Sequence, residues 1–206
     1  IIGVVAVVLV VALVGILAVI GSGGDDPEQT ATDDPTTSGS SSPTESAATD
    51  PTTPAGEQIA GDGYAFTLPD EWTDVTDAVT GSGEGGLTDL AVAWGDTFDS
   101  ARANLIVETG FAGGETDPEA IRGEWESNMT GATGATPMDT GPTTIAGEDA
   151  VTVKIARTNE NGIEIEQFGY LTIHEGDLYS IILSAQAGDE KAQEAGQEIL
   201  DSWTWQ

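Results

Sequence analysis

The sequence predicts an α+β domain, in which two or more helices pack against an antiparallel β-sheet, preceded by one transmembrane helix and a disordered linker. Three features of the 206 residues support this fold class. Residues 1–20 are uncharged and apolar, residues 21–56 are rich in Ser, Thr, Pro and Asp, and residues 57–206 combine β-patterned runs with two helical patterns. About 150 residues remain for the domain, which is enough for one hydrophobic core.

The first segment, IIGVVAVVLVVALVGILAVI, is expected to cross a membrane. A helix of this length is about 30 Å long, which matches the hydrocarbon thickness of a bilayer. Apolar residues occupy every face, so a core helix of a small domain is a poor alternative. A cleavable signal peptide stays open as the weaker interpretation, because its apolar region is shorter, about 7 to 15 residues. Since the chain opens without Met or a basic flank, we expect a cytoplasmic piece to precede Ile1.

The linker that follows predicts the side of the membrane on which the domain lies. Residues 21–54 hold seven acidic residues and no Lys or Arg, and loops poor in these two residues belong outside the cytoplasm. Large apolar residues are nearly absent, so the segment cannot bury enough surface to fold. We therefore expect an acidic stalk that presents an extracytoplasmic domain. Whether its Ser and Thr residues are glycosylated stays open.

The charge and the cysteine count exclude several classes of function. The formal net charge is -31, with 36 acidic against 5 basic residues. Such a surface repels phosphate backbones, so nucleic acid is excluded as a partner, whereas basic partners and cations are favoured. Divalent cations are expected to bind only non-specifically, and a saline habitat is an open explanation for the acidity. The absence of Cys removes disulfides, thiolate metal sites and a lipidated-Cys anchor.

In the first half of the domain, short strands precede a helix. Residues 64–68 alternate between apolar and polar and end at a Pro69 turn, and residues 87–94 and 104–109 are further short strands. Between residues 115 and 129 the pattern changes to a helix with Pro in its first turn. One face of this helix is expected to be apolar, with Ile121, Trp125 and Met129.

The second half predicts a three-stranded antiparallel meander and a final helix. Strands are expected at 150–157, 163–174 and 178–185, joined by turns that contain Gly162 and Gly176. Asp189 is expected to cap the last helix. The apolar face of that helix is formed by Ala192, Ala195, Ile199 and Trp203.

Six segments follow one another in a recognisable order: Tyr64–Trp72, the mid-chain helix, Ile145–Ala150, Tyr170–Ile173, Tyr179–Leu183 and Ile199–Trp203. Their order resembles the PsbP-like domain family over the region from Gly61 to Trp205. The resemblance implies an antiparallel sheet packed by helices, a fold shared by the photosystem subunit PsbP, a nuclear Ran-binding factor and bacterial envelope lipoproteins. Some of these lipoproteins bind lipidic or glycolipid ligands, and most members act by binding. This chain differs from the lipoprotein members in having a span and no lipidated Cys, and no functional residue is carried over.

No residue pattern indicates catalysis. Residues 81–86 fit G-x-G-x-x-G, but a strand rather than a helix is expected to follow, so a hairpin loop is favoured. His174 is the only histidine and is expected at the surface beside a turn, whereas a triad or a zinc site needs further partners. Carboxylate pairs are too numerous in so acidic a domain to be informative. We predict no catalytic, cofactor-binding or metal-ligating residues and no cofactor.

One strand face is a candidate for ligand binding. Alternate residues along the strand 163–174 combine acidic and aromatic side chains, and a groove lined by both could hold a ligand. Packing under a helix, with the acids at the rim, explains the pattern equally simply and stays open. The candidate groove residues are Glu164, Glu166, Phe168 and Tyr170.

Together these observations predict a membrane-anchored, surface-displayed and non-catalytic binding or accessory module of the cell envelope. Its ligand is unidentified, with an envelope lipid, a glycolipid or a protein partner as candidates. One alternative is a structural or stability factor without a small ligand, which predicts a filled sheet face. A weaker alternative is an envelope hydrolase, which predicts two carboxylic acids in one deep pocket with raised pKa values.

Overall fold

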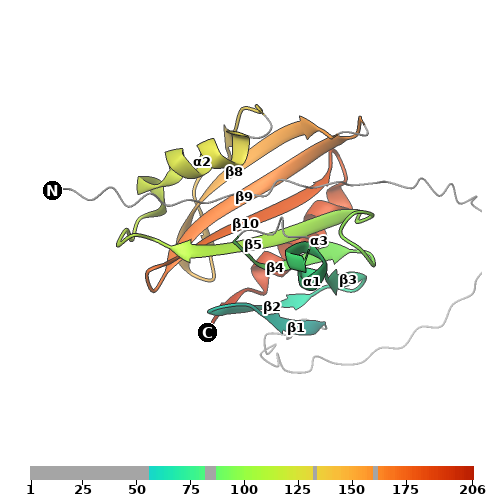
Figure 1. The fold of residues 1–206 in the computed structure, drawn as a ribbon, viewed down its shortest axis with the longest axis horizontal. Coiled ribbons are helices and arrows are strands. Elements are labelled where there is room, and N and C mark those ends of the chain that lie inside the picture. The colour runs from blue at the N-terminus through green and yellow to red at the C-terminus, as the bar shows by residue number, and fades with distance from the viewer. Residues whose placement is uncertain (1–55, 82–86, 132–133, 160–161) are drawn as a thin grey trace, which may run out of the picture.

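Two antiparallel sheets form the domain in the computed structural model, which describes residues 56–81, 87–131, 134–159 and 162–206 (Figure 1). Within these residues, the large sheet has eight strands in the order β3-β4-β5-β10-β9-β8-β6, and β7 pairs with β8. The small sheet has the order β1-β2-β11. The strands of the large sheet are β3 (Trp72–Asp74), β4 (Thr88–Trp94), β5 (Ala103–Phe111), β6 (Met138–Asp139), β7 (Thr143–Ile145), β8 (Glu148–Thr158), β9 (Glu164–His174) and β10 (Asp177–Gln186). Those of the small sheet are β1 (Glu57–Ala60), β2 (Tyr64–Leu68) and β11 (Thr204–Trp205).

The predicted meander is confirmed. β8, β9 and β10 pair in antiparallel succession along nearly their whole length. The turn between β9 and β10 has two residues, Glu175 and Gly176, with φ angles of 52° and 95°. Two consecutive positive φ angles are typical of a type I′ turn, whose twist matches that of paired strands. The Gly that indicated a turn in the sequence therefore also fixes the register.

Helices cover both faces of the large sheet (Figure 1). The helix α2 (Arg122–Gly131) lies across β8 and β9 on one side, and α3 (Glu190–Asp201) lies on the other side against β10, β5 and β2. A short helix, α1 (Thr76–Gly81), follows β3 and contacts β4. The predicted α+β class, with helices packed on an antiparallel sheet, is thus confirmed.

The predicted helix over residues 115–129 is wrong at its start. The chain instead forms a 3-10 turn, Pro118–Ala120, and α2 begins at Arg122. The Asp117 side chain caps this turn, because it accepts a hydrogen bond from Glu119 N at 2.9 Å. Ile121 has a φ angle of -113°, outside helical geometry, and this residue separates the two helical pieces.

A glycine in β9 allows α2 to lie close to the sheet. A Cβ atom on Gly169 would lie 2.7 Å from Met129 Cε and 3.0 Å from the Trp125 ring. Because both side chains are buried, the Gly169→Val substitution is expected to lower the free energy of unfolding by about 1 to 3 kcal/mol through overpacking. Urea unfolding would measure this loss. Gly110→Val is the matched control, because a Cβ atom there meets open space, and an equal loss in both variants would contradict the packing argument.

An aromatic cluster on the α3 side joins the two sheets. Trp203 follows α3 and stacks on Tyr64 of β2, with ring centroids 4.3 Å apart, and on Phe66 at 5.4 Å. Tyr179 of β10 meets the Tyr64 ring edge-on at 5.8 Å. The same core continues under α3, which buries Ala192, Gly196, Ile199 and Leu200.

Some sequence predictions fall outside the described residues. The transmembrane helix over residues 1–20 and the linker as far as residue 55 lie there, as does most of the glycine-rich segment 81–86. In the part of the chain that the structure describes, no helix is both long enough and apolar enough to cross a membrane.

Candidate functional site

The four residues of the predicted groove lie on the α3 side of β9, where Glu166, Phe168 and Tyr170 are half-buried and Glu164 is exposed. Lys154 of the neighbouring strand β8 contacts two of these residues, Glu166 and Phe168. Its Nζ lies 2.6 Å from Glu166 Oε1 and 5.3 Å from the centre of the Phe168 ring. The strand period therefore places the side chains together, as predicted.

Helix α3 borders the same face of β9. Gln193 Nε2 donates a hydrogen bond to Glu166 Oε2 at 2.9 Å. Burial raises the pKa of Tyr170, and the charge of Asp201 near the end of α3 raises it further. Phe168 and Tyr170 also pack against the main core. These contacts account for the acidic and aromatic pattern as packing beside a helix, and ligand binding at this face stays a prediction.

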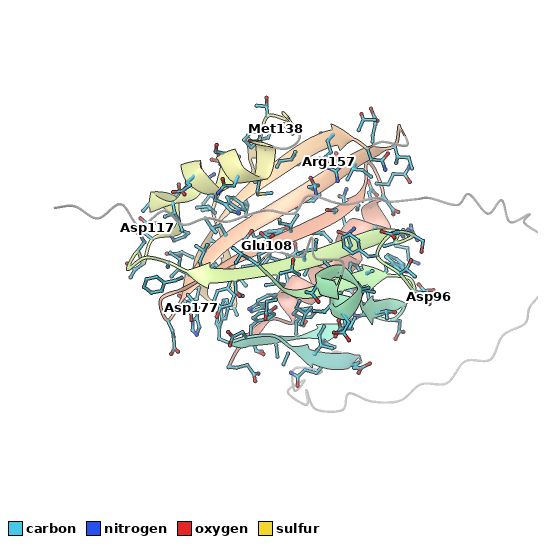
Figure 2. All side chains as sticks on the ribbon, viewed as in Figure 1. Asp96, Glu108, Asp117, Met138, Arg157 and Asp177 are labelled. Carbon is cyan, nitrogen blue, oxygen red and sulfur yellow. The ribbon has the colours of Figure 1, made fainter. Side chains whose placement is uncertain are left out.

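A pocket lies on the opposite flank of α3. It has a volume of about 360 Å³ and is formed where the turn before β3, the end of β4 and the exposed flank of α3 meet. Figure 2 shows Asp96, two residues beyond Trp94, at the end of the sheet away from Asp177, the first residue of β10. The pocket is lined by Pro69, Asp70, Glu71, Trp94, Lys191, Glu194, Ala195 and Glu198.

The pocket has an aromatic, partly buried side and a charged, exposed rim. Trp94 and Ala195 are half-buried, whereas the four lining carboxylates are exposed. Two cations lie over the Trp94 ring: the Arg102 guanidinium carbon is 4.6 Å from the ring centre and Lys191 Nζ is 5.2 Å from it. Both distances are typical of cation–π contacts.

An arginine–aspartate pair fixes the start of α3 beside this pocket. Arg102 donates from Nε and one terminal nitrogen to the Asp189 carboxylate, at 2.7 and 2.8 Å. Asp189 also caps α3 as predicted, because it accepts a hydrogen bond from Ala192 N at 3.1 Å. The pKa of Asp189 lies below its ordinary value of 3.8, mainly because of the hydrogen bonds from Arg102.

This pair predicts a pH dependence of stability. Folding lowers the pKa of the Asp189 carboxyl, so the ionised carboxyl stabilises the native state fully at pH values above its unfolded-state pKa, near 3.8. This stabilisation is lost as the pH falls through the lower pKa of the native state. The Asp189→Asn variant keeps a capping oxygen and loses the charge. We expect its free energy of unfolding to fall less than that of the wild type between pH 5 and pH 2, measured by urea titration. Parallel pH profiles would contradict the assignment.

The turn that carries two of the rim carboxylates is strained. Glu71 has a φ angle of 71°, a left-handed conformation that costs a non-glycine residue about 1 kcal/mol or more. Two backbone hydrogen bonds hold the turn: Trp72 N donates to Pro69 O at 3.2 Å, and Gly95 N donates to Glu71 O at 2.9 Å. The second bond ties the turn directly to the end of β4, beside Trp94.

His174 lies beside a turn, as expected, but its side chain is only partly exposed. Its side chain is 19% exposed, and Nδ1 lies 2.8 Å from Glu148 Oε1. The imidazole also stacks on the Trp205 ring at 4.4 Å. Among the described residues, no three or more His, Cys, Asp or Glu side chains are grouped to hold a metal ion. His174 therefore serves to pack the end of the large sheet against β11.

Comparison with solved structures identifies the fold. CyanoP, the cyanobacterial PsbP of Synechocystis sp., superposes with a TM-score of 0.54 at 14% identity, and the alignment covers 78% of this chain and 98% of that one. The fold is PsbP-like. A second solved structure, the E65A mutant of the protein Mog1, superposes with a TM-score of 0.50 at 12% identity, and the alignment covers 72% of this chain and 95% of that one.

The PsbP-like region also matches part of a larger protein. A Bacteroides thetaiotaomicron structure aligns with a TM-score of 0.50 at 14% identity, over 73% of this chain, but the aligned part spans only 48% of that protein. No protein-family model matches the chain, and no curated protein sequence matches it. The resemblance predicted from short sequence motifs is therefore confirmed for the fold.

The sequence did not predict the pocket of the PsbP-like domain. Its lining comes from residues 69–71, 94 and 191–198, which are distant in the chain. One signal was available: Lys191, Glu194 and Glu198 recur at helical spacing, beside the apolar face that the sequence identified.

Proposed function

We propose that this PsbP-like chain is a non-catalytic, membrane-tethered binding module of the cell envelope. Its binding surface is the pocket between α3 and the Pro69–Trp72 turn. The pocket carries the proposal because it is a concave surface with a half-buried aromatic ring in its lining, and ligand sites are typically concave and lined by aromatic side chains. The sequence of residues 1–20 supports the tether, and the acidic linker supports display outside the cytoplasm.

The carboxylates of the pocket argue against the hydrolase alternative. General acid catalysis near neutral pH needs a carboxyl whose pKa is raised by burial. All four lining carboxylates are exposed, so water solvates their charged forms. Arg122 lowers the pKa of Glu119, as Arg102 lowers that of Asp189, and both shifts are opposite to the one that a general acid needs.

Native mass spectrometry tests the binding function. The full chain, isolated in mild detergent from its native envelope, is expected to carry a discrete non-covalent mass, which identifies a lipid, a glycolipid or a peptide. The Trp94→Ala variant is expected to lose this mass, while Phe168→Ala, on the other flank of α3, keeps it. If the wild-type chain carries no bound mass, and gains none when envelope extract is added, this result would instead favour the structural-factor alternative.

A further inference from the structure

The Trp94 pocket is suited to a positively charged group. The face of an indole ring attracts cations, and the chain places two of its own cations over this ring. Arg102 is held there by its paired hydrogen bonds to Asp189. Lys191 is not held in this way, because no described carboxylate lies within ion-pairing distance of its ammonium group. It is an exposed cation that lies over the ring.

The rim carries more negative charge than the chain neutralises. Four carboxylates and a single lysine line the pocket. None of the four is in an ion pair with a basic residue of the described part of the chain. Two of them project from α3 one turn apart, at Glu194 and Glu198, and two come from the strained turn. A cation placed on Trp94 would thus be approached by acids from both sides.

We propose that this pocket binds a lysine or arginine side chain of a basic segment in a partner protein. The incoming cation displaces Lys191 from the Trp94 face and is neutralised by the rim carboxylates. This inference rests on the proposed function and adds the chemical class of the ligand.

Size and charge support this occupant over others. A volume of about 360 Å³ is near the lower end of small-ligand sites, about 300 to 1,000 Å³, and admits side chains rather than a folded domain. A phosphate headgroup would be repelled by the rim. The net charge of -31 favours encounter with a basic partner.

The test compares binding of two blocked tripeptides, acetyl-Lys-Ala-Lys-amide and acetyl-Gln-Ala-Gln-amide, to the full chain in detergent. The salt concentration is about 0.15 M, so that distant charges are screened. Isothermal titration calorimetry is expected to show binding of the lysine peptide only. The Glu194→Gln/Glu198→Gln variant is expected to bind it about 3- to 10-fold more weakly, because two close ion pairs are lost. The control variant is Glu115→Gln/Glu124→Gln, which changes the charge equally at exposed residues away from the pocket. It is expected to change the affinity less than 2-fold.

A second pair of variants separates the pocket from general electrostatic attraction. Lys191→Met removes one of the two cations over the ring and is expected to tighten lysine-peptide binding at least 3-fold, since Lys191 no longer competes for its place on the Trp94 face. Lys154→Met removes the same charge on the other flank of α3 and is expected to leave the affinity within 2-fold. Equal effects within either pair of variants, or equal binding of both peptides, would overturn the inference. A different result separates this inference from the proposed function. If the lysine peptide does not bind, but the Trp94→Ala variant still loses the bound mass that the wild type carries from the envelope, then the binding function stands and a basic ligand is excluded.

Discussion

Replacing Trp125 with alanine is expected to lower the free energy of unfolding by about 3 to 5 kcal/mol, the range for removing a large buried aromatic side chain. Trp125 is 1% exposed and lies between α2 and the sheet. Its Nε1 donates a hydrogen bond to the buried Ser180 Oγ at 3.0 Å, so the substitution also leaves a hydroxyl without its donor. Because α2 has only 10 residues, it depends on this contact and on Met129 to stay on the sheet.

Urea unfolding measures the total loss, and the Trp125→Phe variant separates its two causes. Phenylalanine retains most of the packing and loses the hydrogen bond, so a decrease of about 1 to 2 kcal/mol is expected. Amide hydrogen exchange should also quicken in α2 before it quickens in β10. If Trp125→Ala cost less than 1 kcal/mol, α2 would not be anchored as described.

Replacing Trp203 with alanine is expected to have a similarly large effect, about 3 to 5 kcal/mol. Its side chain is 4% exposed and stacks on Tyr64 and Phe66 of the small sheet. The substitution opens a cavity where α3, the small sheet and the large sheet meet. The loss therefore weakens the contact between the sheets as well as the core beneath α3.

Trp205→Ala is the matched control for this site, since it removes the same side chain two residues later. Trp205 is only half-buried and packs on His174 and Tyr179 at the edge of the cluster. Its loss is expected to cost about 1 to 2 kcal/mol, because less surface is withdrawn from water. Equal losses for Trp203→Ala and Trp205→Ala, measured by urea unfolding, would show that the stack on Tyr64 does not join the sheets.

Local patterns predicted the parts of the fold that local forces determine. The alternation of Val151, Val153 and Ile155 and the turn at Gly176 correctly placed β8 to β10, and Asp189 correctly placed the start of α3. Strands of two to four residues, such as β1 and β11, gave no signal because they are too short to alternate. They exist through pairing with β2, which is distant from β11 in the sequence.

The candidate site, like the fold, could be predicted from the sequence only where local patterns determine it. The sequence placed Glu166, Phe168 and Tyr170 on one strand face, because side-chain direction in a strand depends only on its period of two. It could not place Trp94 against Lys191, since that contact depends on how α3 crosses the sheet. The left-handed conformation of Glu71 was equally hidden, because it follows from the backbone bond to Gly95 and not from residue type.

The central claim is that ligand binding occurs in the pocket between α3 and the Pro69–Trp72 turn. Hydrogen–deuterium exchange of the full chain, with and without envelope extract, tests it most directly. The account predicts slower exchange at residues 69–71, around Trp94 and along residues 191–198. Protection confined to residues 164–170, or no added protection in any peptide, would contradict it.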